Sequence, residues 1–225
     1  MSPTVTQPAT LERRVRILDA AERVFAAEGI HSATMNAVAL EAQMSPGNLY
    51  RYFPSKEAIV AGLAERDRTE ILTDFAALAH GPVTFDALEA LGRRHLVDEP
   101  RRKMMITLQI WAESTRNPDV AKLCLGVEGA VSQGLQAFVT LAKANGEVPH
   151  DLHDEDFILA IFMLVDGFMR FRATKPDFDA AHAADLMFKS IRILAATLKT
   201  DFSQTSAAAD APVARAPISF VDKVS

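Results

Sequence analysis

Apolar residues recur at steps of three and four positions along most of this chain, and this spacing restricts its fold more than any other feature. Residues at such steps lie on one face of an α-helix, whereas a half-buried strand alternates apolar and polar residues. The sequence has no run of β-branched alternation, no two-residue hairpin turn and no internal repeat. The pattern therefore predicts an all-α fold. The first helix has its apolar stripe on Leu11, Val15, Leu18, Ala21, Val24 and Phe25.

Three short helices are predicted at the start of the chain by residues that begin and end helices. The first helix ends near Gly29, and Thr34 is a suitable N-cap for a second, short helix. Ser45 and Pro46 supply a cap and a first-turn proline for a third helix. This helix ends before Pro54, because proline disfavours helical geometry in the residue that precedes it.

A long fourth helix and five further helices are predicted for the rest. Ser55 caps the fourth helix, which runs to about Ala79. Glycine, proline and asparagine then mark breaks at residues 80–82, 99–100, 117–118, 145–149 and 175–176. The sequence thus predicts nine helices.

Composition restricts the class of protein. Apolar residues make up 49% of the chain, which is ample for a packed core. The single cysteine excludes an intrachain disulfide, and no signal-peptide pattern opens the sequence, so we expect a cytoplasmic protein. The longest fully apolar run, residues 157–165, is far shorter than the roughly 20 residues of a membrane-spanning helix. The net charge is −5, although residues 1–56 are slightly basic.

Four segments follow from these patterns. Residues 1–10 are polar and without periodicity, which predicts a disordered lead-in. Residues 11–56 form a three-helix domain and residues 57–200 a larger helical domain, and the fourth helix, from about residue 55, links the two. Residues 201–225 are rich in Ala, Ser, Pro and Asp and are expected to form a flexible tail.

The first domain has the pattern of a helix-turn-helix, in which the last of three short helices enters the DNA major groove. Its residues also resemble the DNA-binding domain of the TetR family, in the stretches ILDAAERVFAAEG (17–29), TMNAVA (34–39) and SPGNLYRYFPSK (45–56). The resemblance covers roughly residues 13–60. It implies a nine-helix TetR-like architecture, with a C-terminal helical domain for ligand binding and dimerisation. Gln43 stands where the family usually has glycine, so this residue is expected to adopt a left-handed conformation at a cost of about 1 kcal/mol, or to shift the turn.

The third helix is expected to face DNA on one side and the domain core on the other. Leu49 and Phe53 are four residues apart and are expected to face inward with Val38, Phe25 and Ile59. Arginine pairs with guanine, an amide pairs with adenine and glycine permits close approach, whereas hydroxyls and lysine suit phosphate oxygens. By resemblance, Asn36 is the base-reaching position of the second helix, and the phosphate contacts fall on Thr34, Tyr50, Tyr52 and Lys56. The complete predicted DNA-binding set is Thr34, Asn36, Ser45, Pro46, Gly47, Asn48, Tyr50, Arg51, Tyr52 and Lys56.

The last two long helices are predicted to form a homodimer interface. Residues 154–174 are apolar almost all round in their middle, so one face is expected to meet a partner helix. Two such helices from each of two chains make a four-helix interface, the arrangement of the family, which presents two recognition helices about one DNA turn apart. The alternative is that both helices are simply buried within a monomer. The predicted interface residues are Phe157, Ile161, Leu164, Phe188, Ile191, Leu194 and Leu198.

Flexible methionines and aromatic residues of the larger domain are suited to lining an adaptable pocket, and the resemblance implies that a small-molecule effector binds there. The alternative, which the pattern slightly favours, is that most of them are ordinary core residues and that Asp166 and Arg170 form an i,i+4 ion pair. Gly126, Gly129 and Gly134 indicate either close helix packing or space for a ligand. The predicted pocket residues are Met104, Met105, Gln109, Trp111, Glu113, Phe138, Met163, Asp166, Phe168 and Arg170.

The resemblance to the TetR family thus implies a repressor that binds a palindromic operator in double-stranded DNA as a dimer and is released by a small molecule. An adjacent efflux or catabolic operon is the target that the family suggests. A ligand-independent or activating regulator of the same fold is the alternative.

No nucleophile elbow, P-loop or dinucleotide motif supports an enzyme, and no cofactor is predicted. His150 and His153 among acidic residues permit a metal site and Cys124 a redox switch, but helix-dipole stabilisation and a buried thiol explain these residues without either.

Overall fold

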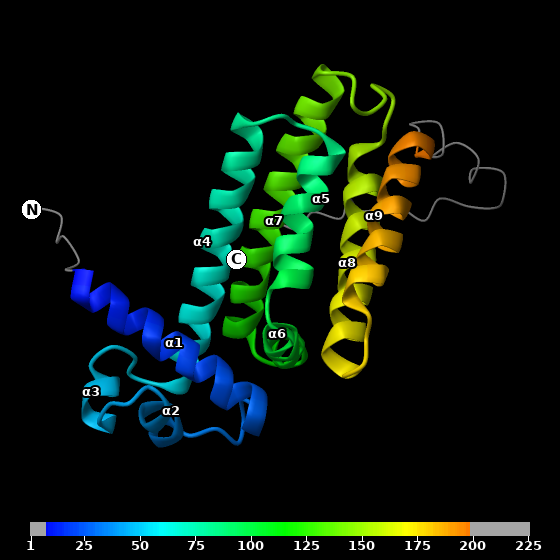
Figure 1. Cartoon of the computed structure of the whole chain (residues 1–225). Coiled ribbons are helices and arrows are strands. Elements are labelled where there is room, and N and C mark those ends of the chain that lie inside the picture. The colour runs from blue at the N-terminus through cyan, green and yellow to red at the C-terminus, as the bar shows by residue number, and fades with distance from the viewer. Residues whose placement is uncertain (1–7, 199–225) are drawn as a thin grey trace, which may run out of the picture. The chain divides into compact units, whose positions relative to one another are not determined.

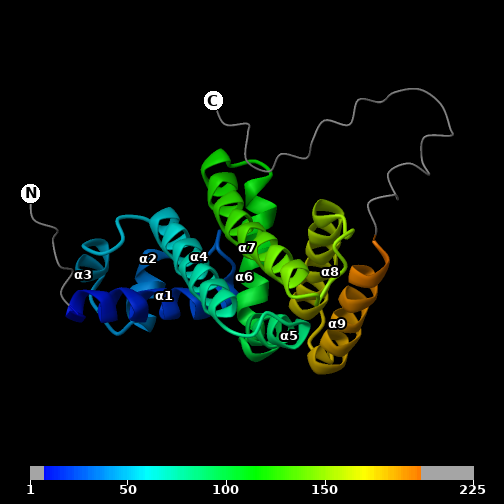
Figure 2. The same ribbon diagram turned by 90° about the horizontal axis from the view of Figure 1, so that it is seen from above.

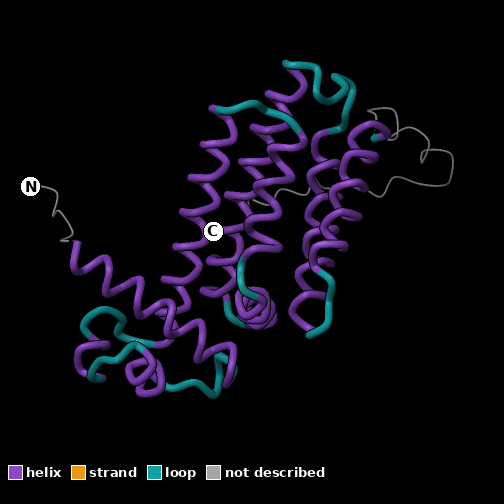
Figure 3. Tube along the Cα trace, viewed as in Figure 1, coloured by secondary structure: helices purple, strands orange, loops and turns teal. Residues whose placement is uncertain are grey.

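The computed structural model describes residues 8–198, and this part of the chain consists of helices and loops without a strand (Figure 3). The predicted all-α fold of nine helices is confirmed there, and each predicted break separates two helices. A π-helical turn, Arg94–Asp98, continues the fifth helix. The helices are α1 (Pro8–Glu28), α2 (Met35–Glu41), α3 (Pro46–Tyr50), α4 (Lys56–His80), α5 (Phe85–Arg93), α6 (Arg101–Ser114), α7 (Pro118–Ala144), α8 (Asp154–Thr174) and α9 (Ala180–Thr197).

The chain becomes helical earlier than its periodicity predicts. The expected lead-in was residues 1–10, but α1 already begins at Pro8. Proline is tolerated in the first turn of a helix because the amide that it lacks would have no partner there. Residues 1–7 and the predicted tail, 201–225, lie outside the described part of the chain.

The helices divide into two compact units, neither of which is continuous in sequence. Unit 1 comprises Met1–Asp67 and Pro100–Cys124, and unit 2 comprises Arg68–Glu99 and Leu125–Ser225. The sequence predicts two continuous domains that meet near residue 56. In the structure, unit 1 also contains α6, which lies much later in the chain than α1, α2 and α3. The chain therefore passes between the units after Asp67, after Glu99 and after Cys124.

The core of unit 1 holds α2 and α3 against α1 (Figure 1). Phe25, Leu49 and Ile59 are completely buried, and Val38 and Phe53 are almost so. These are the five residues predicted to face inward, and the prediction is confirmed. Burial of each such side chain contributes about 1.5 to 3 kcal/mol, so the short α3 depends on its neighbours rather than on its own helix propensity.

The core of unit 2 contains most apolar residues of α8 and α9, which lie side by side in both ribbon views (Figures 1 and 2). Phe85 of α5 and Phe138 of α7 meet edge to face there, with their ring centroids 5.8 Å apart. No helix among residues 8–198 is both long and apolar enough to cross a membrane.

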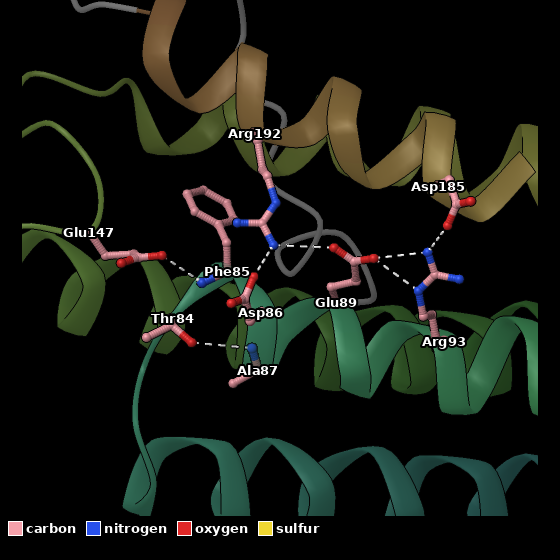
Figure 4. Close-up of polar contacts among 9 residues, drawn as sticks. All are labelled: Thr84, Phe85, Asp86, Ala87, Glu89, Arg93, Glu147, Asp185 and Arg192. Carbon is pink, nitrogen blue, oxygen red and sulfur yellow. Dashed lines mark hydrogen bonds and ion pairs between the residues drawn. The ribbon is translucent and has the colours of Figure 1, made fainter. Parts of the chain in front are cut away.

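Ion pairs fix α5 against α9 at the surface of unit 2 (Figure 4). The Nη2 atom of Arg192 lies 2.5 Å from an oxygen of Asp86 and 3.2 Å from one of Glu89. Arg93 of α5 lies in turn between Glu89 and Asp185 of α9. Each of the two helices thus supplies an arginine that pairs with a carboxylate of the other helix. Because Glu89 contacts both arginines, these ion pairs form a network rather than isolated pairs.

Candidate DNA-binding surface

Hydroxyl side chains start both helices of the helix-turn-helix, as predicted. The Oγ1 atom of Thr34 accepts a hydrogen bond from the amide of Ala37 at 3.1 Å. The Oγ atom of Ser45 accepts one from the amide of Asn48 at 3.3 Å, and Pro46 occupies the first turn of α3. Such caps satisfy amides that the helix itself leaves free, and each is worth about 1 kcal/mol.

The turn between α2 and α3 contains Gln43 in the left-handed conformation. Its φ is 55°, the only positive value at a non-glycine residue among the described residues. The amide of the next residue, Met44, donates to the carbonyl of Ala39 at 2.9 Å, which closes the turn. The predicted left-handed conformation of Gln43 is therefore confirmed, and the turn keeps a geometry that usually requires glycine.

The opposite faces of α3 differ sharply in exposure. Leu49 is completely buried, whereas Gly47, Tyr50 and Arg51 are exposed and Asn48 is half-buried. A side chain at Gly47 would meet no atom within 4 Å, so the backbone there is open to close approach. The exposed residues lie together on one short helix. The other exposed members of the predicted set, around the starts of α2 and α3, are Thr34, Asn36, Ser45 and Pro46.

Tyr52 and Lys56 have partners within unit 1 that the sequence did not reveal. The Tyr52 hydroxyl accepts a hydrogen bond from Arg13 at 3.1 Å, and its carbonyl accepts one from Arg14 at 3.1 Å. The Lys56 ammonium donates to the carbonyls of His31 at 2.8 Å and Ala33 at 3.2 Å. Arg13 and Arg14 thus bring the start of α1 to the predicted phosphate-contacting residue Tyr52. The only signal for them in the sequence is their charge on the polar side of the predicted helix.

The predicted effector residues are distributed between the two units. Of the five on α6, in unit 1, Met104 is buried, and Gln109 and Glu113 contact the α1–α2 loop. In unit 2, Phe138 and Phe168 are core residues, whereas Met163 is 63% exposed. The remaining members are the half-buried Met105 and Trp111 on α6 and the exposed Asp166 and Arg170 on α8.

A second carboxylate, which sequence reasoning missed, lies near Asp166. Burial raises the pKa of Glu128 on α7, and the charge of Asp166 raises it further. Partial desolvation also raises the pKa of Asp166, although the residue as a whole is exposed. Instead of forming the ion pair considered from the sequence, Arg170 lies over the ring of Phe171, with Cζ 4.2 Å from its centroid. The neighbouring Gly129 has no atom within 4 Å of the place where a side chain would begin.

Four of the seven predicted dimer-interface residues are core residues of a single chain, and the interface itself stays a prediction. Phe157, Ile161, Phe188 and Ile191 are at most 6% exposed within a single chain, because they form the core of unit 2. The other three predicted residues are only partly buried and pack against the same core: Leu164, Leu194 and Leu198. The large apolar residues that α8 and α9 do expose are Met163, Leu186 and Ile193.

The residues considered for a metal or redox role have other surroundings. His153 is the N-cap of α8, and its Nδ1 atom accepts a hydrogen bond from the amide of Asp156 at 3.4 Å. Within residues 8–198 no three histidine, cysteine or acidic side chains are grouped to hold a metal ion. Cys124 is half-buried near the start of α7.

Comparison with known proteins agrees with this geometry. Residues 17–63 match the family described as "Bacterial regulatory proteins, tetR family". The HTH-type transcriptional regulator UidR of Escherichia coli (strain K12) is 31% identical over 149 residues, which cover 62% of this chain and 71% of UidR. The HTH-type transcriptional repressor KstR of Mycobacterium tuberculosis is 31% identical over 153 residues, 64% of each chain. The structure of Salmonella enterica GusR, 28% identical, superposes with a TM-score of 0.68 over 86% of this chain and 99% of GusR. The chain therefore belongs to the tetR family of bacterial regulatory proteins.

Proposed function

We propose that this protein is a transcriptional repressor that binds a palindromic operator as a homodimer and releases it when a small molecule binds. The observation that carries the proposal is the two-sided α3. Its inward face is fixed by Leu49, while Gly47, Asn48 and Arg51 are available to DNA. A short helix with a half-buried amide, an exposed guanidinium next to it and open backbone suits the major groove.

The residues of the proposed DNA-binding surface divide into two roles. Arg51 suits the O6 and N7 atoms of guanine, and Asn48 suits adenine. Thr34, Tyr50 and Tyr52 have hydroxyls for phosphate oxygens, which fix the position of the protein on the duplex. Asn36, exposed on α2, is the second base-reaching position.

Lys56 fits a phosphate contact even though it has two partners in the protein. An ammonium group has three N–H donors, and two of those of Lys56 go to backbone carbonyls of the α1–α2 loop. The third is left for a phosphate oxygen. Lys56 therefore has a structural and a DNA-binding role together, which makes it a poor choice for a mutation meant to test DNA contact alone.

Dimerisation through α8 and α9 is the second part of the proposal. Met163, Leu186 and Ile193 are each more than half exposed, and the two helices that carry them lie side by side (Figure 2). Exposed large apolar residues on neighbouring helices are typical of a surface that a partner covers. A second copy of the chain, which supplies the second recognition helix for a palindrome, is the proposed partner.

The small molecule is proposed to bind in unit 2, beside α7 and α8. Gly129 and Gly167 are half-buried, yet a side chain at either would meet nothing within 4 Å. The half-buried Glu128 lies in the same part of α7.

The regulated genes that we propose are those of an adjacent efflux or catabolic operon. The protein would act in the cytoplasm, where the operator is, and as a regulator without catalytic activity.

Selection of genomic DNA fragments by the purified protein tests the repressor function. We expect a short inverted repeat to be enriched by the wild type and by Arg170→Ala, which removes an exposed arginine of unit 2. Arg51→Ala should weaken binding about 10- to 100-fold, because one bidentate base contact is worth about 1 to 3 kcal/mol. If the wild type enriches no sequence even at low salt, DNA recognition by α3 is wrong.

A further inference from the structure

The loop between α1 and α2 is held by side chains of α6. The Oε1 atom of Gln109 accepts a hydrogen bond from the amide of Ile30 at 2.8 Å. One turn further along α6, an oxygen of Glu113 lies 3.2 Å from Nε2 of His31, and Arg116 lies 3.2 Å from the same nitrogen. This loop leads directly into Thr34, the cap of α2. The start of the helix-turn-helix thus depends on a helix that lies more than 60 residues later in the chain.

The amide of Ile30 needs Gln109 because of the way in which α1 ends. Gly29 has a φ of 82°, and its amide donates to the carbonyl of Phe25 at 2.9 Å. This is the simple left-handed helix end with one hydrogen bond, which leaves the next amide without a partner in the helix. Gln109 supplies that partner at a part-buried position. Without Gln109, this part-buried amide would lose its partner within the protein.

The rest of α6 fixes Gln109 in place against α1. Ile106 is 4% exposed and belongs to the core of unit 1. Near the start of α6, Arg102 lies 3.6 Å from Glu22, the only buried charged residue among those described. Burial raises the pKa of Glu22, and Arg66 acts against this effect. Residues 102, 106, 109 and 113 follow helical spacing, so one face of α6 makes all these contacts.

The connections of α6 point to a regulatory role. The chain enters unit 1 from unit 2 just before α6 and returns to unit 2 within α7, after Cys124. The chain on both sides of α6 is therefore continuous with unit 2. Since α6 also holds the α1–α2 loop, it can pass a change in unit 2 to the helix-turn-helix.

We infer that Gln109 is a positioning residue for DNA binding and that, through its hydrogen bond to Ile30, α6 controls the geometry of α2 and α3. This inference rests on the proposed function, in which α3 binds DNA. Gln109 lies on α6 and is not one of the proposed DNA contacts. Its loss should therefore alter how well the recognition helix is placed, without removing a phosphate contact.

Operator affinity measured over a range of salt concentrations tests the inference. Gln109→Leu removes the acceptor and should weaken binding about tenfold, with an unchanged slope of affinity against salt, because the slope counts phosphate contacts. Gln109→Glu keeps an oxygen acceptor and should restore affinity to within about twofold. Gln136→Leu is the matched control: Gln136 lies in unit 2 and donates to Asp154 at 3.0 Å. If Gln109→Leu binds like the wild type, or if its salt slope falls, the inference is wrong.

Hydrogen exchange of the free protein tests the same inference without DNA. Gln109→Leu should speed exchange of the Ile30 amide and of the amides of α2, whereas Gln109→Glu should not. Faster exchange confined to Ile30 would overturn control of α2 by α6. If the wild type binds no operator while exchange in α2 still responds to Gln109, the proposed function fails and the control of α2 stands.

Discussion

Gln43 adopts a left-handed conformation that is unfavourable for glutamine and that glycine would adopt without strain. We expect Gln43→Gly to raise the free energy of unfolding by roughly 0.5 to 1 kcal/mol. The relief of left-handed strain, about 1 to 2 kcal/mol, exceeds the stabilisation of the unfolded chain by glycine, about 0.4 to 1 kcal/mol. Urea denaturation measures the change. Gln133→Gly, at an exposed position inside α7, is the matched control and should lower stability by about 1 kcal/mol. Equal losses in both variants would contradict the prediction.

Glu128 should make stability depend on pH. Its pKa is raised in the folded protein, so the folded state binds its proton more tightly, and the stability that this provides is lost as pH rises through the folded pKa. At pH 7 the half-buried charge is therefore unfavourable. Glu128→Gln should raise the melting temperature at pH 7 by an amount equivalent to less than about 1 kcal/mol, because solvent screens part of the effect.

The gain from Glu128→Gln should shrink as the pH falls toward 4.5, the ordinary pKa of a glutamate, where the wild-type side chain also becomes neutral. Glu155→Gln, at an exposed position in the first turn of α8, is the control. It should give no gain, because the helix dipole favours a negative charge there. A gain that persists at low pH would show that burial of charge is not its cause.

Single residues were predictable from the sequence where the cause is local. The caps at Thr34 and Ser45 and the left-handed Gln43 each depend on a few neighbouring residues, so the pattern was sufficient. The contact between Gln109 and Ile30 joins residues 79 positions apart. It depends on how α6 packs against α1, and helical periodicity holds no information on that.

At the scale of elements, two glycines five residues apart in α7 differ in the space around them. A side chain at Gly134 would begin 2.2 Å from the ring of Phe75, whereas one at Gly129 would meet nothing within 4 Å. Gly134→Ala should therefore destabilise the protein by about 1 to 3 kcal/mol through overpacking. Gly129→Ala should stabilise it by about 0.5 to 1 kcal/mol, because alanine favours the helix. Thermal unfolding of both variants measures the difference, and a loss of stability for Gly129→Ala would contradict open space at this position.

Helices and their ends were predictable because proline, glycine and capping residues act within one turn. The faces of α8 and α9 were not. Their middle parts are so rich in apolar residues that the pattern cannot separate the side facing the chain's own core from a side facing a partner. Phe157 and Ile191 were assigned to the partner but belong to the core, and the exposed Leu186 and Ile193 were overlooked.

At the scale of the whole molecule, the apolar surface on α8 and α9 should control assembly. The double variant Leu186→Glu/Ile193→Glu places two charges where a partner helix is proposed, so we expect a dimeric wild type and a monomeric variant in sedimentation velocity. Operator affinity should fall by at least about 100-fold, because a monomer contacts one half-site. Leu141→Glu, at another exposed apolar position of unit 2, should leave the dimer intact. A double variant that still sediments as a dimer would place the interface elsewhere.

The discontinuity of unit 1 limits how the parts of this protein can be exchanged. The family match ends at residue 63, yet the helix that covers α1 and holds the entrance to α2 comes from residues 101–114. A chimera that takes only the N-terminal segment from one regulator and the remainder from another would pack α1 of one protein against α6 of the other. The side chains of these two helices would not be complementary. Transfer of DNA specificity therefore requires the exchange of two separate segments, the N-terminal helices and residues 101–114. Recombination between relatives should give a folded protein most often when both segments come from the same parent.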